Sequence, residues 1–153
     1  MNPRVVIGED SPVEQKLLEA LLRSQPGLEV QVYSDGLELY HEVHRDPPDL
    51  IVLDLMLPGL DGFMITRLLK SSSRFQGVML LCTSSIREDD LEQRVRALGA
   101  DLFLPKPIHP DRLLQSVRRL LDAPAAAPPR VPVEIALDPD EPIEVMPGTD
   151  GRC

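Results

Sequence analysis

The sequence has 153 residues, which suits one globular domain with an appendage, and an apolar fraction of 42% can fill one core. The formal net charge of −9 disfavours a surface built for nucleic acid, so we expect no nucleic-acid partner. No apolar run reaches the length of about 18 residues needed to span a membrane. Two cysteines, Cys82 and Cys153, make no disulfide framework. We therefore expect a cytoplasmic protein with no membrane partner.

Residues 4–8 predict a first short strand, which Glu9 and Asp10 follow at once. Ser11 and Pro12 then begin a helix, because Ser caps helices and Pro suits the first helical position. Glu14, three residues after the Ser, would complete a capping box. Apolar residues at helical spacing continue this helix and predict a stripe that faces the core: Val13, Leu17, Leu18, Leu21 and Leu22.

The next segments alternate between strand and helix patterns. Residues 28–32 alternate apolar and polar side chains, as an edge strand half open to water does. Residues 35–45 predict a helix that ends before Pro47 and Pro48. Residues 50–53 then form an uninterrupted apolar run into Asp54, which predicts a strand buried on both faces in the middle of a parallel sheet.

After this central strand, Pro58 and Gly59 predict a turn and Asp61 caps a third helix that begins near Gly62. An apolar strand at 78–82 leads to Thr83, and a short strand at 102–104 leads to Lys106. Helical spacing marks a fourth helix before Gly99 and a fifth that ends at residue 121. This alternation of strands and helices predicts an α/β fold with a doubly wound, five-stranded parallel sheet.

A change of composition at residue 122 predicts a domain boundary. Residues 1–121 form the predicted domain, whereas residues 122–153 hold 7 of the 16 prolines and 7 acidic residues against 2 basic ones. We interpret residues 122–153 as a Pro-rich acidic linker or tail, or as the start of a truncated β-rich output domain.

Reactive side chains follow four of the predicted strands, and the carboxyl ends of parallel strands meet at one edge of a sheet. Neighbouring strands lie roughly 5 Å apart, so Glu9, Asp10 and Asp54 would crowd together and require a cation. Oxygen ligands of this kind favour Mg²⁺. The Thr83 hydroxyl and the Lys106 ammonium would complete a clamp for phosphoryl oxygens, with Asp54 as the nucleophile.

This ordered set resembles the receiver domain of two-component response regulators over residues 4–121. The resemblance rests on motifs in the same order: Glu9-Asp10, Asp54, Pro58-Gly59, Asp61-Gly62, Thr83 and Lys106-Pro107. It implies a flavodoxin-like sheet with strand order 2-1-3-4-5. It also implies a cis peptide bond before Pro107.

The resemblance further implies a set of site residues. Asp54 would accept a phosphoryl group from a histidine kinase or a phosphotransfer protein. Mg²⁺ (or Mn²⁺) would be held by Asp10, Asp54 and the carbonyl of Met56, with Glu9 acting through water. Met56 and Ser85 occupy positions that tune phosphoryl lifetime, and neither is an acid or amide that readily orients water. We therefore expect slow self-hydrolysis.

The family also implies a switch. Thr83 would move toward the phosphoryl group, and the aromatic residue Phe103 would turn inward. This motion would alter the face made by the fourth helix, fifth strand and fifth helix, where a downstream protein binds and where homodimers are common in the family. Phe103 has no hydroxyl, so it could signal its position only by packing.

The predicted function is thus a phosphorylation-dependent signalling switch that is no enzyme beyond its own phosphorylation and dephosphorylation. One alternative is a receiver-like binding module that is never phosphorylated. Another is a hydrolase with an aspartyl-phosphate intermediate, although that class usually has a second acid where this chain has Met56. Taken singly, Glu9-Asp10 could be a helix-start pair and Asp54 a strand-end cap. His41 and His44 have metal-ligand spacing but no third ligand nearby, which favours a solvated helix face.

Overall fold

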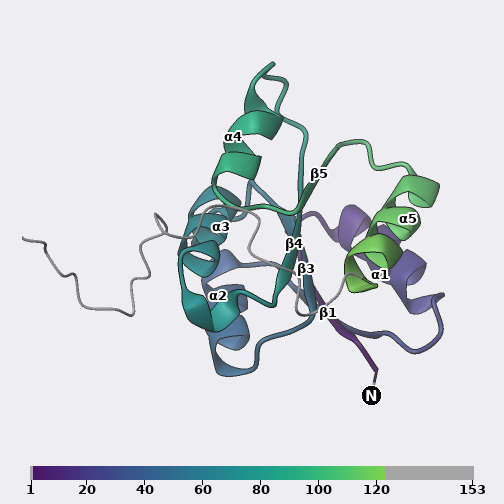
Figure 1. Ribbon diagram of the computed structural model, residues 1–153. Helices are drawn as coiled ribbons and strands as arrows, with labels where there is room; N and C mark the ends of the chain where they lie inside the picture. The colour runs from purple at the N-terminus through teal and green to yellow at the C-terminus, as the bar shows by residue number, and fades with distance from the viewer. Residues whose placement is uncertain (1, 123–153) are drawn as a thin grey trace, which may run out of the picture.

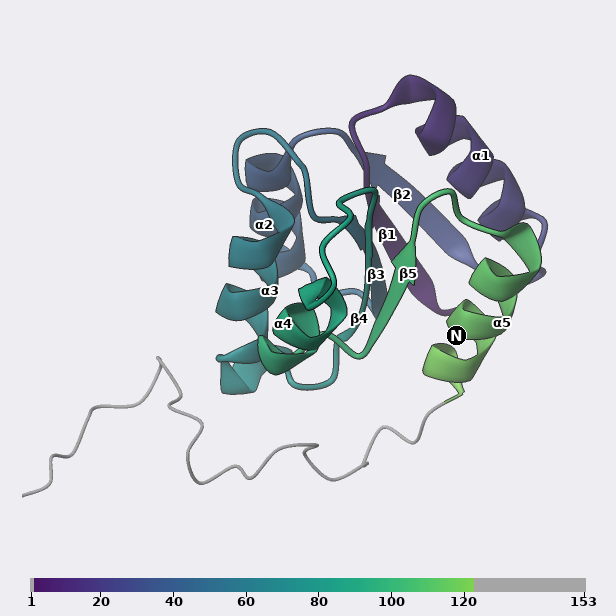
Figure 2. The ribbon, with the colours of Figure 1, turned by 90° about the horizontal axis from the view of Figure 1, so that it is seen from above.

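The computed structural model describes residues 2–122 (Figure 1), and its five strands form one parallel sheet in the order β2-β1-β3-β4-β5 (Figure 2). The predicted flavodoxin-like order is therefore confirmed. The central position belongs to β3, whose five residues are all buried. The strands are β1 (Arg4–Gly8), β2 (Glu29–Tyr33), β3 (Leu50–Asp54), β4 (Met79–Ser84) and β5 (Leu102–Pro105).

Helices cover both faces of the sheet. Figure 2 shows α1 and α5 on one face and α2, α3 and α4 on the other. Each face has its own apolar core, as an interleaved strand and helix pattern requires. The helices are α1 (Pro12–Arg23), α2 (Gly36–Arg45), α3 (Gly62–Lys70), α4 (Leu91–Ala97) and α5 (Pro110–Leu121), and a short 3-10 helix, η1 (Ser73–Phe75), follows α3.

The start of α1 differs from the prediction in two ways. Val13 is 77% exposed and Leu17 is 45% exposed, so the core-facing stripe was wrong at these positions. The sheet meets only one side of α1, which buries Leu18 and Leu22. The predicted capping box is also incomplete, because the Ser11 backbone N–H donates to Glu9 Oε2 at 3.1 Å.

Two ion pairs lie near the amino ends of the strands. The Lys70 ammonium lies 3.1 Å from Asp101 Oδ2, and both side chains are buried. Lys70 Nζ also donates to the Val78 carbonyl, and Asp101 Oδ2 accepts from the Leu80 N–H. At the same end Arg4 Nη2 lies 3.1 Å from Glu42 Oε2. Arg4 and Lys70 therefore each have an acidic partner at this end.

Among residues 2–122, no helix combines the length and the apolar character needed to cross a membrane. The predicted linker or tail at 122–153 lies outside the described residues, apart from Asp122. The boundary at residue 121 therefore stays a prediction.

Cys82 lies on β4 and is fully buried. Burial raises the pKa of its thiol to about 12, against the opposing effect of a hydrogen bond with Thr66. Since only the thiolate reacts readily, we expect Cys82 to resist alkylation at pH 8 in the folded protein. In a Cys153→Ser variant, mass spectrometry should find no label in buffer and one label in urea. Rapid labelling in buffer would contradict this burial.

Candidate functional site

Four strands deliver polar side chains to the same edge of the sheet. Buried Glu9 directly follows β1, and Asp54 is the last residue of β3. Thr83 is the register partner of Asp54 on β4. Lys106 follows β5, and its backbone N–H donates to the Ser84 carbonyl at 2.8 Å. The β4 strand is longer than predicted, so Thr83 lies within it rather than after it.

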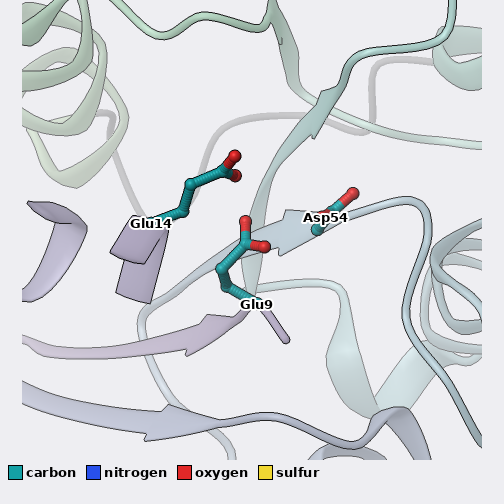
Figure 3. A group of neighbouring side chains, drawn as sticks. All are labelled: Glu9, Glu14 and Asp54. Atoms are coloured by element: carbon teal, nitrogen blue, oxygen red, sulfur yellow. The ribbon is translucent and has the colours of Figure 1, made fainter. Parts of the chain in front are cut away.

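Lys106 is the centre of this group. Its ammonium lies 2.9 Å from Asp54 Oδ2 and 2.8 Å from Glu9 Oε1, and it also contacts Glu14 Oε1. Figure 3 shows the three acidic side chains coming from α1, the end of β1 and the end of β3 toward a shared space. One oxygen from each of the three carboxylates lies within 4.8 Å of the others.

Burial and charge alter the acid–base chemistry of the group. Burial is the main cause that raises the pKa of Glu9 to about 7, and the negative charge of Asp54 adds to it. For Lys106, burial alone lowers the pKa, but hydrogen bonds to Asp54, Glu14 and Glu9 outweigh it and raise the pKa. Lys106 is therefore a permanent cation, whereas Glu9 changes its charge near neutral pH.

Asp54 is held firmly by its surroundings. Its Oδ2 accepts from Lys106, and its Oδ1 accepts from the Met56 backbone N–H at 2.9 Å. The side chain is 6% exposed. A carboxylate with both oxygens engaged on a central strand has a fixed orientation, which is what in-line attack on a phosphorus atom needs.

The remaining predicted residues surround this centre. Asp10 is exposed and does not belong to the group of three converging carboxylates. The Met56 side chain and Ser85 are exposed at the rim, and Phe103 is half-buried on β5. The peptide bond between Lys106 and Pro107 is cis, as the resemblance implied.

The loop after β3 is packed tightly against α2. The Gly36 N–H donates to the Pro58 carbonyl at 2.8 Å, and a Cβ atom on Gly36 would lie 1.7 Å from the Leu60 carbonyl oxygen. Gly59 has a φ of +83°, which glycine adopts without strain. These contacts fix the segment that carries Met56.

Two further residues, Glu14 and Arg87, contact Lys106 although the sequence did not predict them at the site. Glu14 was assigned to a capping box, although its carboxylate contacts Lys106. Arg87 donates to the Lys106 carbonyl at 3.1 Å and so joins two loops of the site rim. Sequence spacing carried no signal for either contact, because both depend on how α1 and the β4–α4 loop meet the end of β5.

The chemistry of these donors fits a divalent cation. Three carboxylates supply hard oxygen atoms, which Mg²⁺ prefers. Lys106 already occupies a cationic position among them. The Thr83 hydroxyl is buried and has no hydrogen-bond partner within residues 2–122, so the rim retains a polar group for an oxygen-rich ligand.

A comparison with protein families matches residues 5–118 to the response regulator receiver domain. Among curated proteins, the response regulator MprA of Mycobacterium leprae is 36% identical over 119 residues, which cover 76% of this chain and 50% of that protein. The chain thus spans about half the length of the curated relatives it matches.

Solved structures agree with this match. The receiver domain of a DNA-binding response regulator from Colwellia psychrerythraea is 26% identical with a TM-score of 0.74, over 78% of this chain and 98% of that one. The receiver domain of a sensor histidine kinase from Pseudomonas aeruginosa, which holds a magnesium ion in its active-site cleft, is 26% identical with a TM-score of 0.70, over 79% and 98%.

These relatives bear on the expectation of no nucleic-acid partner. That expectation rested on the net negative charge of the sequence and on its short acidic C-terminal segment, whereas one matched protein is named as a DNA-binding regulator. The family therefore gives the expectation no support.

Proposed function

This chain belongs to the response regulator receiver domain family, and we propose that it is a signalling switch that accepts one phosphoryl group on Asp54. The observation that carries the proposal is the contact between Asp54 Oδ2 and the Lys106 ammonium at the carboxyl edge of the sheet. A fixed carboxylate beside a permanent cation can attack phosphorus while the cation offsets charge on the phosphoryl oxygens.

The proposed donor is the phosphohistidine of a histidine kinase or phosphotransfer protein, which is consistent with the cytoplasmic setting expected for such a switch. A bond between phosphorus and an Asp54 oxygen forms as the bond between phosphorus and the donor nitrogen breaks. The nitrogen keeps the electron pair of the broken bond, and the donor imidazole leaves. The Met56 N–H holds Asp54 in place, and Lys106 stays within reach of the incoming phosphoryl oxygens.

Asp10, Asp54 and the Met56 carbonyl would hold Mg²⁺ or Mn²⁺, with Glu9 acting through water. Bound there, the cation supplies positive charge that offsets the negative charge of the phosphoryl group. The carboxylates of Glu9, Glu14 and Asp54 outnumber the one ammonium beside them, which supports a cation at this edge of the sheet, whereas the role of Asp10 rests on the family resemblance.

The proposed output follows from Thr83 and Phe103. The buried Thr83 hydroxyl can donate to a phosphoryl oxygen on its register partner Asp54, and Phe103 can repack behind it. The face made by α4, β5 and α5 would then bind a downstream protein or a second copy of the chain. Met56 and Ser85 at the rim carry no acid or amide, which supports slow self-hydrolysis.

The test is phosphoryl uptake from acetyl phosphate with Mg²⁺, read by intact-protein mass. We expect one phosphoryl group on the natural chain, none on Asp54→Asn, and one on Asp111→Asn, which changes an exposed acid on α5. No uptake by the natural chain would instead favour a non-phosphorylated binding module. Rapid turnover of diverse phosphate esters would favour a hydrolase.

A further inference from the structure

We propose that Glu14 is an additional residue of this site, which holds the Lys106 ammonium in the phosphoryl-free state and releases it to the phosphoryl group. The inference rests on the proposed function, since it concerns how Asp54 is phosphorylated. Glu14 lies outside the predicted set of site residues, and three features of α1 and its surroundings give it a positioning role.

The first feature is the reach of Glu14 across elements. It lies on the first turn of α1, yet its carboxylate contacts Lys106, which is 92 residues further along the chain. An oxygen of this carboxylate lies within 4.8 Å of an oxygen of Glu9 and one of Asp54 (Figure 3). Glu14 therefore adds a negative charge directly at the phosphoacceptor.

The second feature is that Glu14 does not close the cap of its own helix. A Glu at this position normally accepts from the backbone N–H of the capping residue. Here the Ser11 N–H donates to Glu9 Oε2, while Ser11 Oγ accepts from the Glu14 N–H. Because Glu9 accepts the hydrogen bond from the Ser11 N–H, the Glu14 carboxylate remains available to Lys106.

The third feature is the difference in burial among the partners of Lys106. An ammonium has three N–H donors, and here three carboxylates surround it. Phosphorylation removes the carboxylate charge of Asp54, so its donor passes to a phosphoryl oxygen, and a second phosphoryl oxygen can reach Lys106 only if Glu9 or Glu14 gives up its contact. The Glu14 side chain is 42% exposed, against 1% for Glu9 and 6% for Asp54. Water can solvate Glu14 after release, so its contact is the least costly to break.

Removing the charge of Glu14 should have two opposite effects. Glu14→Gln removes one negative charge from the group of three carboxylates, so it should weaken Mg²⁺ binding roughly fivefold, as expected for a site close to water. At saturating Mg²⁺, the same change should speed phosphoryl uptake roughly fivefold, because acetyl phosphate is less repelled and Lys106 is freer. A side chain that only supported the fold would produce neither effect.

The experiment compares Glu14→Gln with Glu19→Gln. Glu19 lies further along α1 and pairs with Arg23, so its change removes the same charge away from the site. Isothermal titration calorimetry measures Mg²⁺ affinity, and intact-protein mass measures uptake from acetyl phosphate. We expect weaker Mg²⁺ binding and faster uptake in Glu14→Gln alone. Equal values in the two variants, or slower uptake in Glu14→Gln, would overturn the proposal.

The two proposals fail separately. If the natural chain takes up no phosphoryl group, the switch function fails, while the Mg²⁺ titration still tests whether the Glu14 charge belongs to the site. If Asp54 is phosphorylated but the Glu14 and Glu19 variants behave alike, only the role of Glu14 fails. A change in unfolding free energy without a change in Mg²⁺ affinity would assign Glu14 a structural role and overturn the inference.

Discussion

Replacing Lys106 with Met should destabilise the metal-free protein by about 3 kcal/mol, because it leaves buried acidic side chains without their cation. Glu9 and Asp54 are 1% and 6% exposed, so water cannot take over the role of the ammonium. The variant should gain more stability from Mg²⁺ than the natural chain, because the cation and the lysine compete for the same oxygens. Urea unfolding followed by circular dichroism, with and without Mg²⁺, measures both effects.

The unfolding free energy lost on Lys106→Met should increase with pH. Glu9 has a pKa raised from 4.5 to about 7 in the folded chain, so its neutral form is favoured by folding. The stability that this group contributes is complete below pH 4.5 and is lost as the pH rises through about 7. At pH 5 Glu9 is neutral and needs no cation beside it, whereas at pH 8 it is ionised. The loss of unfolding free energy caused by Lys106→Met should therefore be larger at pH 8 than at pH 5. Lys16→Met, on the exposed side of α1, is the control and should show neither effect.

Substituting Gly36 with Ala should cost about 3 kcal/mol of unfolding free energy. The added Cβ would lie 1.7 Å from the Leu60 carbonyl oxygen, which belongs to the backbone of the loop that follows β3. Alanine favours a helix by only about 1 kcal/mol over glycine, so the clash dominates. Because the same loop carries Met56, the substitution should also weaken Mg²⁺ binding.

The control for this substitution is Gly77→Ala. A Cβ at Gly77 would have no neighbouring atom within 4 Å, so its unfolding free energy should change by less than about 0.5 kcal/mol. Thermal and urea unfolding would compare the two variants. Equal stability of the two would show that the loop after β3 moves freely and that its packing against α2 does not position the site.

Much of the fold follows from local patterns. The apolar run that ends in Asp54 predicted a buried central strand, and β3 is buried along its length. Because parallel strands end at one edge, the same reasoning brought Asp54, Thr83 and Lys106 to neighbouring strand ends. The flavodoxin-like strand order itself was predicted from the family resemblance.

Contacts between distant elements were harder to predict. Glu14 fits a capping box by sequence, but buried Glu9 takes that hydrogen bond, a competition that spacing cannot reveal. Val13 and Leu17 keep helical spacing with Leu18, yet the sheet meets α1 on one side only. In both cases the deciding interaction joins residues whose proximity depends on tertiary packing.

The ion pair of Lys70 and Asp101 has a consequence for how this molecule can change. Its two charges offset each other, whereas at the opposite end of the sheet one lysine faces three acids. An excess of negative charge therefore lies at the carboxyl edge of the sheet, beside Asp54. Replacing Lys70 or Asp101 is therefore expected to affect the stability of the fold, whereas a change of charge at the carboxyl edge is expected to affect the proposed phosphoryl site as well.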